Sequence, residues 1–502
     1  MHTSFPITNI SNLDRGRITV VNDWSGRRVI VIGAARQGLA LARYLARHNA
    51  DVILNDRLPD NELRGEQQSL AGEKVRWVCG GHPLSLLDGA DLVCPSGGIP
   101  LDIPIVKEAQ RRGIFLSNDS QIFLEEVPCP VIGITGSAGK TTTTTLVGRI
   151  AQVAADITAR IDHALPSRRS HQVYPARVWV GGNIGTPLIS ILDQMIENDL
   201  AVMELSSFQL EIMHRAPQGS AILNITPNHL DRHGNMEAYQ AAKARILEFQ
   251  SFADMAVLNR DDLGAWSLAN QVRGNLITFG RNQPPPGQTG TFLTDDGQAL
   301  MLQSIENGME KVHYLMPRKD ISLRGEHNLY NVLAASAIAF GAGIPIEAVV
   351  VGVKNFIGVP HRLEFVRSWK GADWFNDSIA TAPERSIAAI HSFSEPLILL
   401  AGGKDKNLPW EDFARLVATR VKHLILFGEL ADKIAQAMIT YTPESKVKIT
   451  HCSNLFQAVQ TAAKALSPGD VVLFSPGGTS FDEFRDFEDR GEAYKKWVME
   501  LP

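Results

Sequence analysis

One stretch of the sequence constrains the fold more than any other, a glycine-rich turn between an apolar run and a helical pattern. Residues 131–134 predict a buried strand, and residues 142–153 carry the apolar spacing of a helix. Between them stand the turn Gly-Ser-Ala-Gly at 136–139, then Lys140 and Thr141. Backbone N–H groups of such a turn, a lysine and a hydroxyl that binds Mg²⁺ together hold a triphosphate. The alternative is an ordinary strand–turn–helix corner, which the Lys-Thr pair in this place disfavours.

The stretch therefore predicts a nucleoside triphosphate site. The residues that we expect to bind ATP there are Gly136, Ser137, Ala138, Gly139, Lys140, Thr141 and Thr142.

Length and composition narrow the class of protein. A chain of 502 residues is too long for one core, so we expect two to four domains. The net charge of -5 argues against a nucleic-acid-binding protein, and no apolar run approaches the roughly 20 residues that span a bilayer. The first 23 residues lack the apolar core of a signal peptide, and four scattered cysteines indicate reduced thiols. We expect a cytoplasmic monomer with no membrane partner.

The N-terminal part begins with a strand–helix–strand pattern over residues 28–55 that ends at Asp56 and Arg57. The pattern is typical of dinucleotide-binding folds, but Ala35 replaces the middle glycine that lets the backbone approach a pyrophosphate. The pattern fits a related Rossmann-like half-domain that holds a nucleotide through Asp56 and Arg57 better than it fits an NAD-binding domain. A strand–helix–strand unit without any ligand is the alternative. A further strand at 90–93 leads into Ser96 and Gly97, at the strand end where open α/β sheets bind ligands.

Strands alternate with helices along the whole chain, which predicts an α/β protein with largely parallel sheets. We expect three domains: a Rossmann-like N-terminal domain (1–127, with an extension at 1–26), a central P-loop domain (128–357) and a Rossmann-like C-terminal domain (358–502). Residues 154–178 predict an irregular, exposed insertion, and residues 281–300 a loop or hairpin.

Polar residues follow several predicted strands. Glu204 ends one of them, where a carboxylate near a phosphate loop would bind Mg²⁺. His229, Asp231 and His233 have a spacing compatible with zinc, but no third histidine or cysteine is near, and His229 alone could be a buried structural residue.

Near the C-terminus, Ser480 and Glu483 have the spacing of a helix capping box. Phe481, Phe484 and Phe487 are spaced like a stripe that faces the core.

Taken in order, these pieces closely resemble the Mur ligases of peptidoglycan synthesis. The resemblance is carried by residues 133–141, 181–185 (Gly-Gly-Asn-Ile-Gly), 204–209 (Glu-Leu-Ser-Ser-Phe-Gln), 229–233, Lys243, 325–331, His361-Arg362, 376–378 (Asn-Asp-Ser) and 475–482. Two of these runs, 204–210 and 475–484, are most similar to the members that join glutamate to UDP-MurNAc-L-Ala.

The resemblance implies a ligase that uses ATP and Mg²⁺, with UDP-MurNAc-L-Ala and D-glutamate as substrates and an acyl-phosphate intermediate. It implies catalytic roles for Lys140, Lys243, His229 and Asn183. It places the metal at Thr141, Glu204, His229 and Lys243, the last as a carbamylated lysine. It assigns the nucleotide to Asn328, Arg362 and Asp377 besides the phosphate loop. It assigns the UDP-substrate to Arg36, Gln37, Asp56, Arg57, Ser96 and Gly97. It assigns the amino acid to Thr381, Lys406, Ser480, Phe481 and Phe487.

Three departures from the family pattern bear on the amino acid and on the uridine substrate. Ser96 is followed by two glycines where Pro-Gly is usual, Ile379 stands where the family often has lysine, and 475–480 reads Ser-Pro-Gly-Gly-Thr-Ser. Another Mur ligase or a folylpolyglutamate synthetase-like ligase with a different amino acid therefore stays open. So does a non-catalytic nucleotide-binding protein, although pure binding does not require the magnesium ligands.

Overall fold

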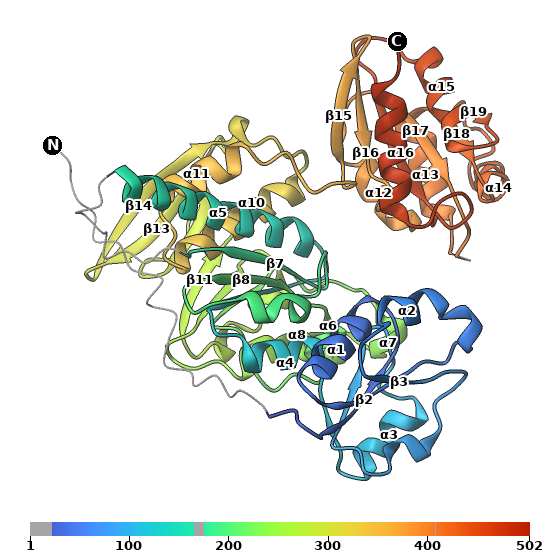
Figure 1. The fold of residues 1–502 in the computed structure, drawn as a ribbon. Coiled ribbons are helices and arrows are strands. Elements are labelled where there is room, and N and C mark those ends of the chain that lie inside the picture. Colours follow the sequence, from blue (N-terminus) through green and yellow to red (C-terminus); the bar gives the residue numbers. More distant parts are fainter. Residues whose placement is uncertain (1–22, 165–174, 407) are drawn as a thin grey trace. The chain divides into compact units, whose positions relative to one another are not determined.

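The computed structural model describes residues 23–164, 175–406 and 408–502 (Figure 1). It contains a five-stranded, a nine-stranded and a six-stranded sheet with helices between the strands, as the alternating pattern predicts. The chain forms two compact units, residues 1–320 with 330–355 and residues 321–329 with 356–502. The division into three domains stays a prediction. Within the described ranges, no helix combines the length and the apolarity needed to cross a bilayer.

The five-stranded sheet opens the first unit and is parallel throughout, in the order β3-β2-β1-β4-β5. One face of it packs against α1, and the other packs against α3. This is the doubly wound arrangement expected of a Rossmann-like half. Its strands are β1 (Arg28–Ile32), β2 (Asp51–Asn55), β3 (Val75–Val78), β4 (Leu92–Pro95) and β5 (Phe115–Leu116), and its helices α1 (Arg36–Arg47), α2 (Arg64–Ser69), α3 (Pro104–Arg111) and α4 (Asp119–Glu126).

The nine-stranded sheet has the order β14-β13-β12-β11-β10-β9-β6-β8-β7. It is parallel from β7 to β12, and β13 and β14 extend it as an antiparallel hairpin. Its strands are β6 (Val131–Thr135), β7 (Val178–Gly182), β8 (Leu200–Glu204), β9 (Gly219–Ile222), β10 (Met255–Asn259), β11 (Asn275–Phe279), β12 (Thr289–Leu293), β13 (Ala299–Glu306) and β14 (Met309–Pro317). The associated helices are α5 (Lys140–Ala164), α6 (Ser207–Leu210), α7 (Leu230–His233), α8 (Met236–Glu248), α9 (Leu263–Trp266), α10 (Glu326–Gly341) and α11 (Ile346–Lys354).

A single hydrophobic core joins these two sheets. It contains Val29 and Leu45 from the first sheet and its helix α1, and Val131 and Met203 from β6 and β8, all nearly inaccessible to solvent. Because the core is continuous, the two sheets belong to one compact unit.

One local prediction fails in this unit. Residues 154–164 continue the helix α5, because the phosphate-loop helix extends to Ala164 rather than ending near Val153. The rest of the predicted insertion, up to residue 174, and the N-terminal extension up to residue 22 lie outside the described residues. The segment 281–300 does contain the start of a hairpin, since β12 pairs with β13.

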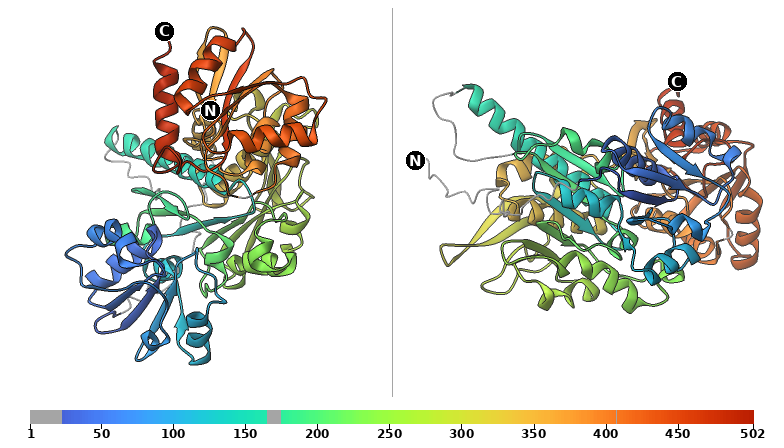
Figure 2. Two further views of the ribbon diagram at one scale, coloured as in Figure 1. Left: turned by 90° about the vertical axis from the view of Figure 1, so that its right-hand side faces the viewer. Right: turned by 60° about the horizontal axis from the view of Figure 1, so that its bottom comes forward.

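The second unit has the sheet order β15-β16-β20-β17-β18-β19, with β15 antiparallel and the rest parallel. Helices cover both faces of it: α12, α13 and α14 pack on one face, and α15 and α16 on the other (Figures 1 and 2). The strands are β15 (Glu364–Trp369), β16 (Ala372–Asn376), β17 (Leu397–Gly402), β18 (Val421–Phe427), β19 (Lys448–His451) and β20 (Val471–Gly477). The helices are α12 (Pro383–Ile390), α13 (Glu411–Arg420), α14 (Ala431–Tyr441), α15 (Leu455–Ala465) and α16 (Phe487–Met499).

Candidate active site

The phosphate loop joins β6 to α5 and is held by the segment that follows β9. The backbone N–H of Ser137 donates to the carbonyl of Asn224 at 2.9 Å, and the N–H of Ala138 donates to the Asn224 side-chain oxygen at 2.8 Å. Gly139 has φ +82°, and a Cβ there would lie 2.2 Å from Oδ1 of Asn331. Only glycine fits this position, so the turn has one backbone path.

Lys140 folds back over the loop from the first turn of α5. Its Nζ donates to the carbonyl oxygens of Gly136 at 2.8 Å and of Ser137 at 3.3 Å. The ammonium group is therefore held at the mouth of the turn, where a phosphate chain would lie.

Glu204, at the end of β8, is the centre of a group of oxygen donors. Its Oε2 accepts from the Thr141 hydroxyl at 2.9 Å, and its Oε1 accepts from Nδ2 of Asn183 at 2.9 Å. The side chain is buried, with 2% of the residue exposed. The hydroxyl of Thr141 and the carboxylate of Glu204 are hard oxygen ligands of the kind that Mg²⁺ prefers, so these two residues fit that ion. The adjacent strands β6 and β8 bring together Thr141 and Glu204, 63 positions apart in the sequence.

Lys243 is on α8 and is buried, although the sequence alone marks it as a lysine on a helix. Its Nζ donates to the Gly136 carbonyl at 3.0 Å and lies 4.7 Å from the centre of the Tyr239 ring. Burial, and next the positive charge of Lys140, lowers the pKa of Lys243 well below its ordinary value. A neutral amine is the form that reacts with carbon dioxide, so this environment fits carbamylation.

His229 and His233 are at the two ends of the segment around α7 and have different surroundings. His229 has a left-handed backbone, and its ring lies edge-on to Phe208 at 5.1 Å. His233 is buried, with Nδ1 2.8 Å from a carboxylate oxygen of Glu211 and Nε2 3.0 Å from the Ser207 hydroxyl. Both ring nitrogens of His233 thus face other side chains, which disfavours a zinc site formed with His229. The described residues contain no cluster of three or more His, Cys, Asp or Glu side chains that could hold a metal.

Residues predicted to bind the uridine substrate lie at the carboxyl edge of the five-stranded sheet. Asp56 accepts from the backbone N–H of Ala34 at 2.7 Å and of Leu58 at 2.9 Å, so its carboxylate braces the turn after β1. The Ser96 hydroxyl donates to the Gly33 carbonyl at 3.1 Å.

The loop at Gly97 also contacts the rest of the first unit. Arg232 from α7 donates to the carbonyls of Gly97 and Gly98, and Arg36 donates to the Asn183 carbonyl at 3.3 Å. A Cβ on Gly97 would lie 3.2 Å from Oε1 of Gln37. The structure thus brings Arg36, Gln37, Ser96 and Gly97 together, while Arg57 follows Asp56 in the neighbouring loop.

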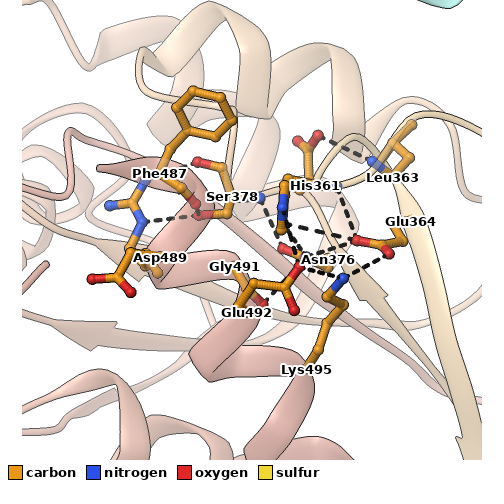
Figure 3. A network of polar contacts seen from close by, with 12 residues as sticks. His361, Leu363, Glu364, Asn376, Ser378, Phe487, Asp489, Gly491, Glu492 and Lys495 are labelled. Carbon is orange, nitrogen blue, oxygen red and sulfur yellow. Dashed lines mark hydrogen bonds and ion pairs between the residues drawn. The ribbon is translucent and has the colours of Figure 1, made fainter. Parts of the chain in front are cut away.

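In the second unit, the end of β16 is tied to α16 by the network of polar contacts in Figure 3. The Asn376 amide donates to Nδ1 of His361 at 3.0 Å, and Lys495 lies 3.1 Å from Glu364 and 2.8 Å from Glu492. His361 is buried, has φ +62° and packs where Gly491 leaves room, since a Cβ on that glycine would lie 2.1 Å from Nδ1. Burial lowers the pKa of His361, which favours the neutral ring that accepts from Asn376.

Asp377 is buried beside this network. Its two oxygens accept from the Ser475 hydroxyl at 2.7 Å and from the backbone N–H of Leu363 at 3.2 Å. Burial raises the pKa of Asp377 to about 7. Burial lowers the pKa of His327, and the positive charge of Arg362, the residue that follows His361, lowers it further. The side chain of Asn328 donates to the Arg324 carbonyl at 2.7 Å.

The residues assigned to the amino acid lie in loops that follow β16, β17 and β20. Nζ of Lys406 is 3.5 Å from the Thr381 hydroxyl, and a two-way backbone bridge joins Lys404 to Thr479, next to Ser480. Phe487 begins α16, with its ring 6.2 Å from that of His361.

Two local predictions in this region are wrong. No helix begins at Ser480, because residues 481–486 form turns and bends and Asp486 caps α16. Phe481 is 64% exposed, so the three phenylalanines form no common core stripe.

Arg490 is a residue that the sequence pattern missed. Its fully buried guanidinium donates to the carbonyl oxygens of Ser378 at 2.9 Å, of Gly478 at 3.1 Å and of Thr479 at 2.9 Å. It therefore holds the loop after β16 and the loop after β20 together. The sequence does carry a signal of its burial, because helical spacing places Arg490 on the same face as the buried Tyr494 and Val498.

Comparison with known proteins agrees with this arrangement. Residues 27–117 match the family described as Mur ligase MurD-like, N-terminal domain, residues 134–339 the Mur ligase middle domain, and residues 361–478 the Mur ligase, glutamate ligase domain. UDP-N-acetylmuramoylalanine--D-glutamate ligase of Symbiobacterium thermophilum is 38% identical over 94% of this chain and 98% of its own. The protein with the same name from Pelotomaculum thermopropionicum is 37% identical over 96% and 99%.

Solved structures with related folds are more distant in sequence. UDP-N-acetylmuramate-alanine ligase MurC from Thermotoga maritima has a TM-score of 0.53 at 17% identity, over 94% of this chain and 99% of its own. MurF from Acinetobacter baumannii has a TM-score of 0.53 at 18% identity, over 96% and 92%. These structures support the fold, and the full-length sequence relatives show the family: this chain belongs to the Mur ligases.

Proposed function

We propose that this protein is an ATP-dependent ligase that joins D-glutamate to UDP-N-acetylmuramoyl-L-alanine in the synthesis of peptidoglycan precursors. The observation that carries the proposal is the group formed by Thr141, Glu204 and Asn183 beside the phosphate loop. A protein that only binds a nucleotide does not need a buried carboxylate facing the loop hydroxyl. The names of the full-length relatives support the choice of substrates.

The chemistry explains why ATP is needed. A carboxylate does not react with an amine, because its oxygen is a poor leaving group. Transfer of the γ-phosphoryl group of ATP to the terminal carboxylate of UDP-MurNAc-L-Ala gives an acyl phosphate and ADP. The neutral amine of glutamate then attacks the acyl carbon, phosphate leaves, and the amine loses a proton as the amide bond forms.

In this scheme the residues of the first unit act on the transferring phosphoryl group. Lys140, held at the mouth of the loop, neutralises its charge. Mg²⁺ supplies further charge neutralisation when bound. The oxygens of Thr141 and Glu204 would hold it, with His229 as a further ligand that the family resemblance suggests.

Lys243 has a role of its own in the proposal. Reaction of its neutral amine with carbon dioxide forms an N–C bond and releases a proton, which leaves a carbamate. Such a group is an anionic oxygen ligand, and it would turn a buried neutral amine into an anionic partner for the ammonium group of Lys140. The proposal therefore includes a carbamylated Lys243.

Residues of the N-terminal sheet and of the second unit complete the assignment. We propose that Arg36, Gln37, Asp56, Arg57, Ser96 and Gly97 bind the uridine substrate, that Asn328, Arg362 and Asp377 contribute to nucleotide binding, and that Thr381, Lys406, Ser480, Phe481 and Phe487 bind the amino acid. The monomeric state and the cytoplasmic location stay predictions.

The test is phosphate release from ATP with UDP-MurNAc-L-Ala, varying only the amino acid among D-Glu, L-Glu, L-Lys and diaminopimelate. Release with D-Glu alone supports the proposal. Release with another of these amino acids supports the ligase chemistry but assigns a different amino-acid substrate. No release with any of them overturns the ligase assignment in favour of a binding protein or a different acceptor.

A further inference from the structure

Two cations are fixed to the same short segment at the end of β16. Arg385, in the first turn of α12, donates from Nη1 to the Ile379 carbonyl at 3.2 Å. Nζ of Lys406, from the loop after β17, is 3.5 Å from the hydroxyl of Thr381. Both side chains belong to solvent-exposed residues, so a ligand can reach them.

In the part of the chain that the structure describes, neither cation forms an ion pair with an acid, and Arg385 acts on the buried carboxyl of Asp377 only through its charge. Partial desolvation is the main cause that lowers the pKa of Lys406, and the positive charges of Arg385 and Arg490 lower it further, so these two arginines add positive potential at Lys406. The adjacent Asp405 pairs with Lys433 at 2.6 Å, and the Asp377 carboxyl is buried and accepts from Ser475. Among the described residues, neither Arg385 nor Lys406 is within 4.0 Å of a carboxylate.

Two cations that have no ion pair among the described residues, beside a hydroxyl, form a site for a carboxylate. A dicarboxylic amino acid fits such a site better than a neutral or basic one, because each carboxylate needs a cation while its amine stays free to react. Position 379 is an isoleucine and supplies no charge. Arg385, from the helix α12 that follows, supplies a positive charge there instead, since its guanidinium donates to the backbone carbonyl of Ile379.

We infer that Arg385 is a further specificity-determining residue, whose guanidinium receives one carboxylate of the incoming dicarboxylic amino acid next to Lys406. This inference rests on the proposed ligase function. It adds a residue to the group assigned to the amino acid by resemblance.

The test compares the full-length protein with R385Q, R385K and R415Q. R385Q removes the charge but keeps an amide that can donate toward the Ile379 carbonyl, so it separates charge from support of the loop. We expect the KM for glutamate to rise roughly tenfold to a hundredfold in R385Q, with kcat and the KM for ATP within about twofold of wild type. R385K should show a smaller rise, because it keeps the charge but not the planar fork.

R415Q is the matched control, since Arg415 is an exposed arginine of the same unit that pairs with Glu411. It should leave all constants unchanged. The difference in KM between R385Q and wild type should also shrink as salt is added, because salt weakens the ionic contact of the wild-type guanidinium, which the variant lacks.

A second comparison shows which carboxylate is bound. If R385Q loses the preference for glutamate over glutamine, Arg385 contacts the side-chain carboxylate. If the KM values for glutamate and glutamine rise equally, Arg385 contacts the α-carboxylate. Either result supports the inference. An unchanged KM for glutamate in R385Q overturns the inference alone, whereas a wild-type protein without glutamate-dependent phosphate release overturns the proposed function first.

Discussion

The phosphate loop of the first unit and the strand-end loops of the second unit are built in different ways. The phosphate loop is one run of consecutive residues, and backbone groups and a glycine define its path. The loops of the second unit come from separate strands and are held by buried side chains, among them His361, Asp377 and Arg490. We expect substitutions in the first region to change chemistry and leave stability alone, and substitutions in the second to change stability as well.

The largest effect should come from K140A. Loss of the ammonium group should lower turnover by at least about a thousandfold, because the transferring phosphoryl group loses its main protein cation. The melting temperature should stay within about 2 °C of wild type, because the hydrogen bonds of Lys140 to the Gly136 and Ser137 carbonyls are made by a half-buried side chain at a loop and contribute little to stability. K354A, which removes an exposed lysine paired with Asp320, is the control and should keep full turnover. Wild-type turnover in K140A would remove the phosphate loop from the mechanism.

K243A should lower turnover by about a hundredfold or more, because the proposed carbamate ligand to the metal would be lost. Short carboxylic acids such as acetate should restore part of the activity, since they can place a carboxylate in the space that the side chain leaves. Turnover is measured with and without the acid, in the presence of Mg²⁺. If K243A is active without any additive, the carbamate has no role.

G491A should destabilise the second unit by about 1–3 kcal/mol. The new Cβ would lie 2.1 Å from Nδ1 of His361, so the ring must move and its hydrogen bond with Asn376 is strained. Denaturant unfolding measures the effect. G65A is the matched control in α2 of the first unit, where a Cβ would meet nothing within 4 Å, and it should be neutral or slightly stabilising. Equal unfolding free energies for the two variants would contradict the described packing.

D377N should change how stability depends on pH. Because burial raises the pKa of Asp377 from 3.8 to about 7, the folded protein holds a proton that the unfolded chain releases over this range. The stability that this group contributes is fully present below about pH 4 and is lost as the pH rises through 7. The unfolding free energy of wild type relative to D377N should therefore fall between about pH 4 and pH 7.

This smallest effect is measured by denaturant unfolding across that pH range. E444Q, at an exposed glutamate of the same unit, is the control and should follow wild type at every pH. Parallel curves for wild type and D377N would show that the carboxyl ionises normally when folded.

The phosphate loop could be predicted from the sequence because its function depends on neighbours in the chain. Strand, turn, lysine and threonine stand in one short run, and the structure places them at the carboxyl end of β6 as expected. The strand ends of the second unit were also predictable one by one, because polar residues interrupt apolar runs there. The capping box at Ser480 was wrong, because tertiary contacts, including the bridge from Lys404 to Thr479, keep that segment in turns.

The sequence by itself determined the α/β class, the strand–turn–helix of the phosphate loop and, through its motifs, the family. Each of these depends on local pattern or on residue identity in order along the chain. Only the tertiary structure decided that Lys243 is buried against Gly136, that Arg490 ties two loops, and that Arg385 stands beside Lys406. Burial and proximity between distant residues arise when the sheets assemble, and they set the charge state and reach of these side chains.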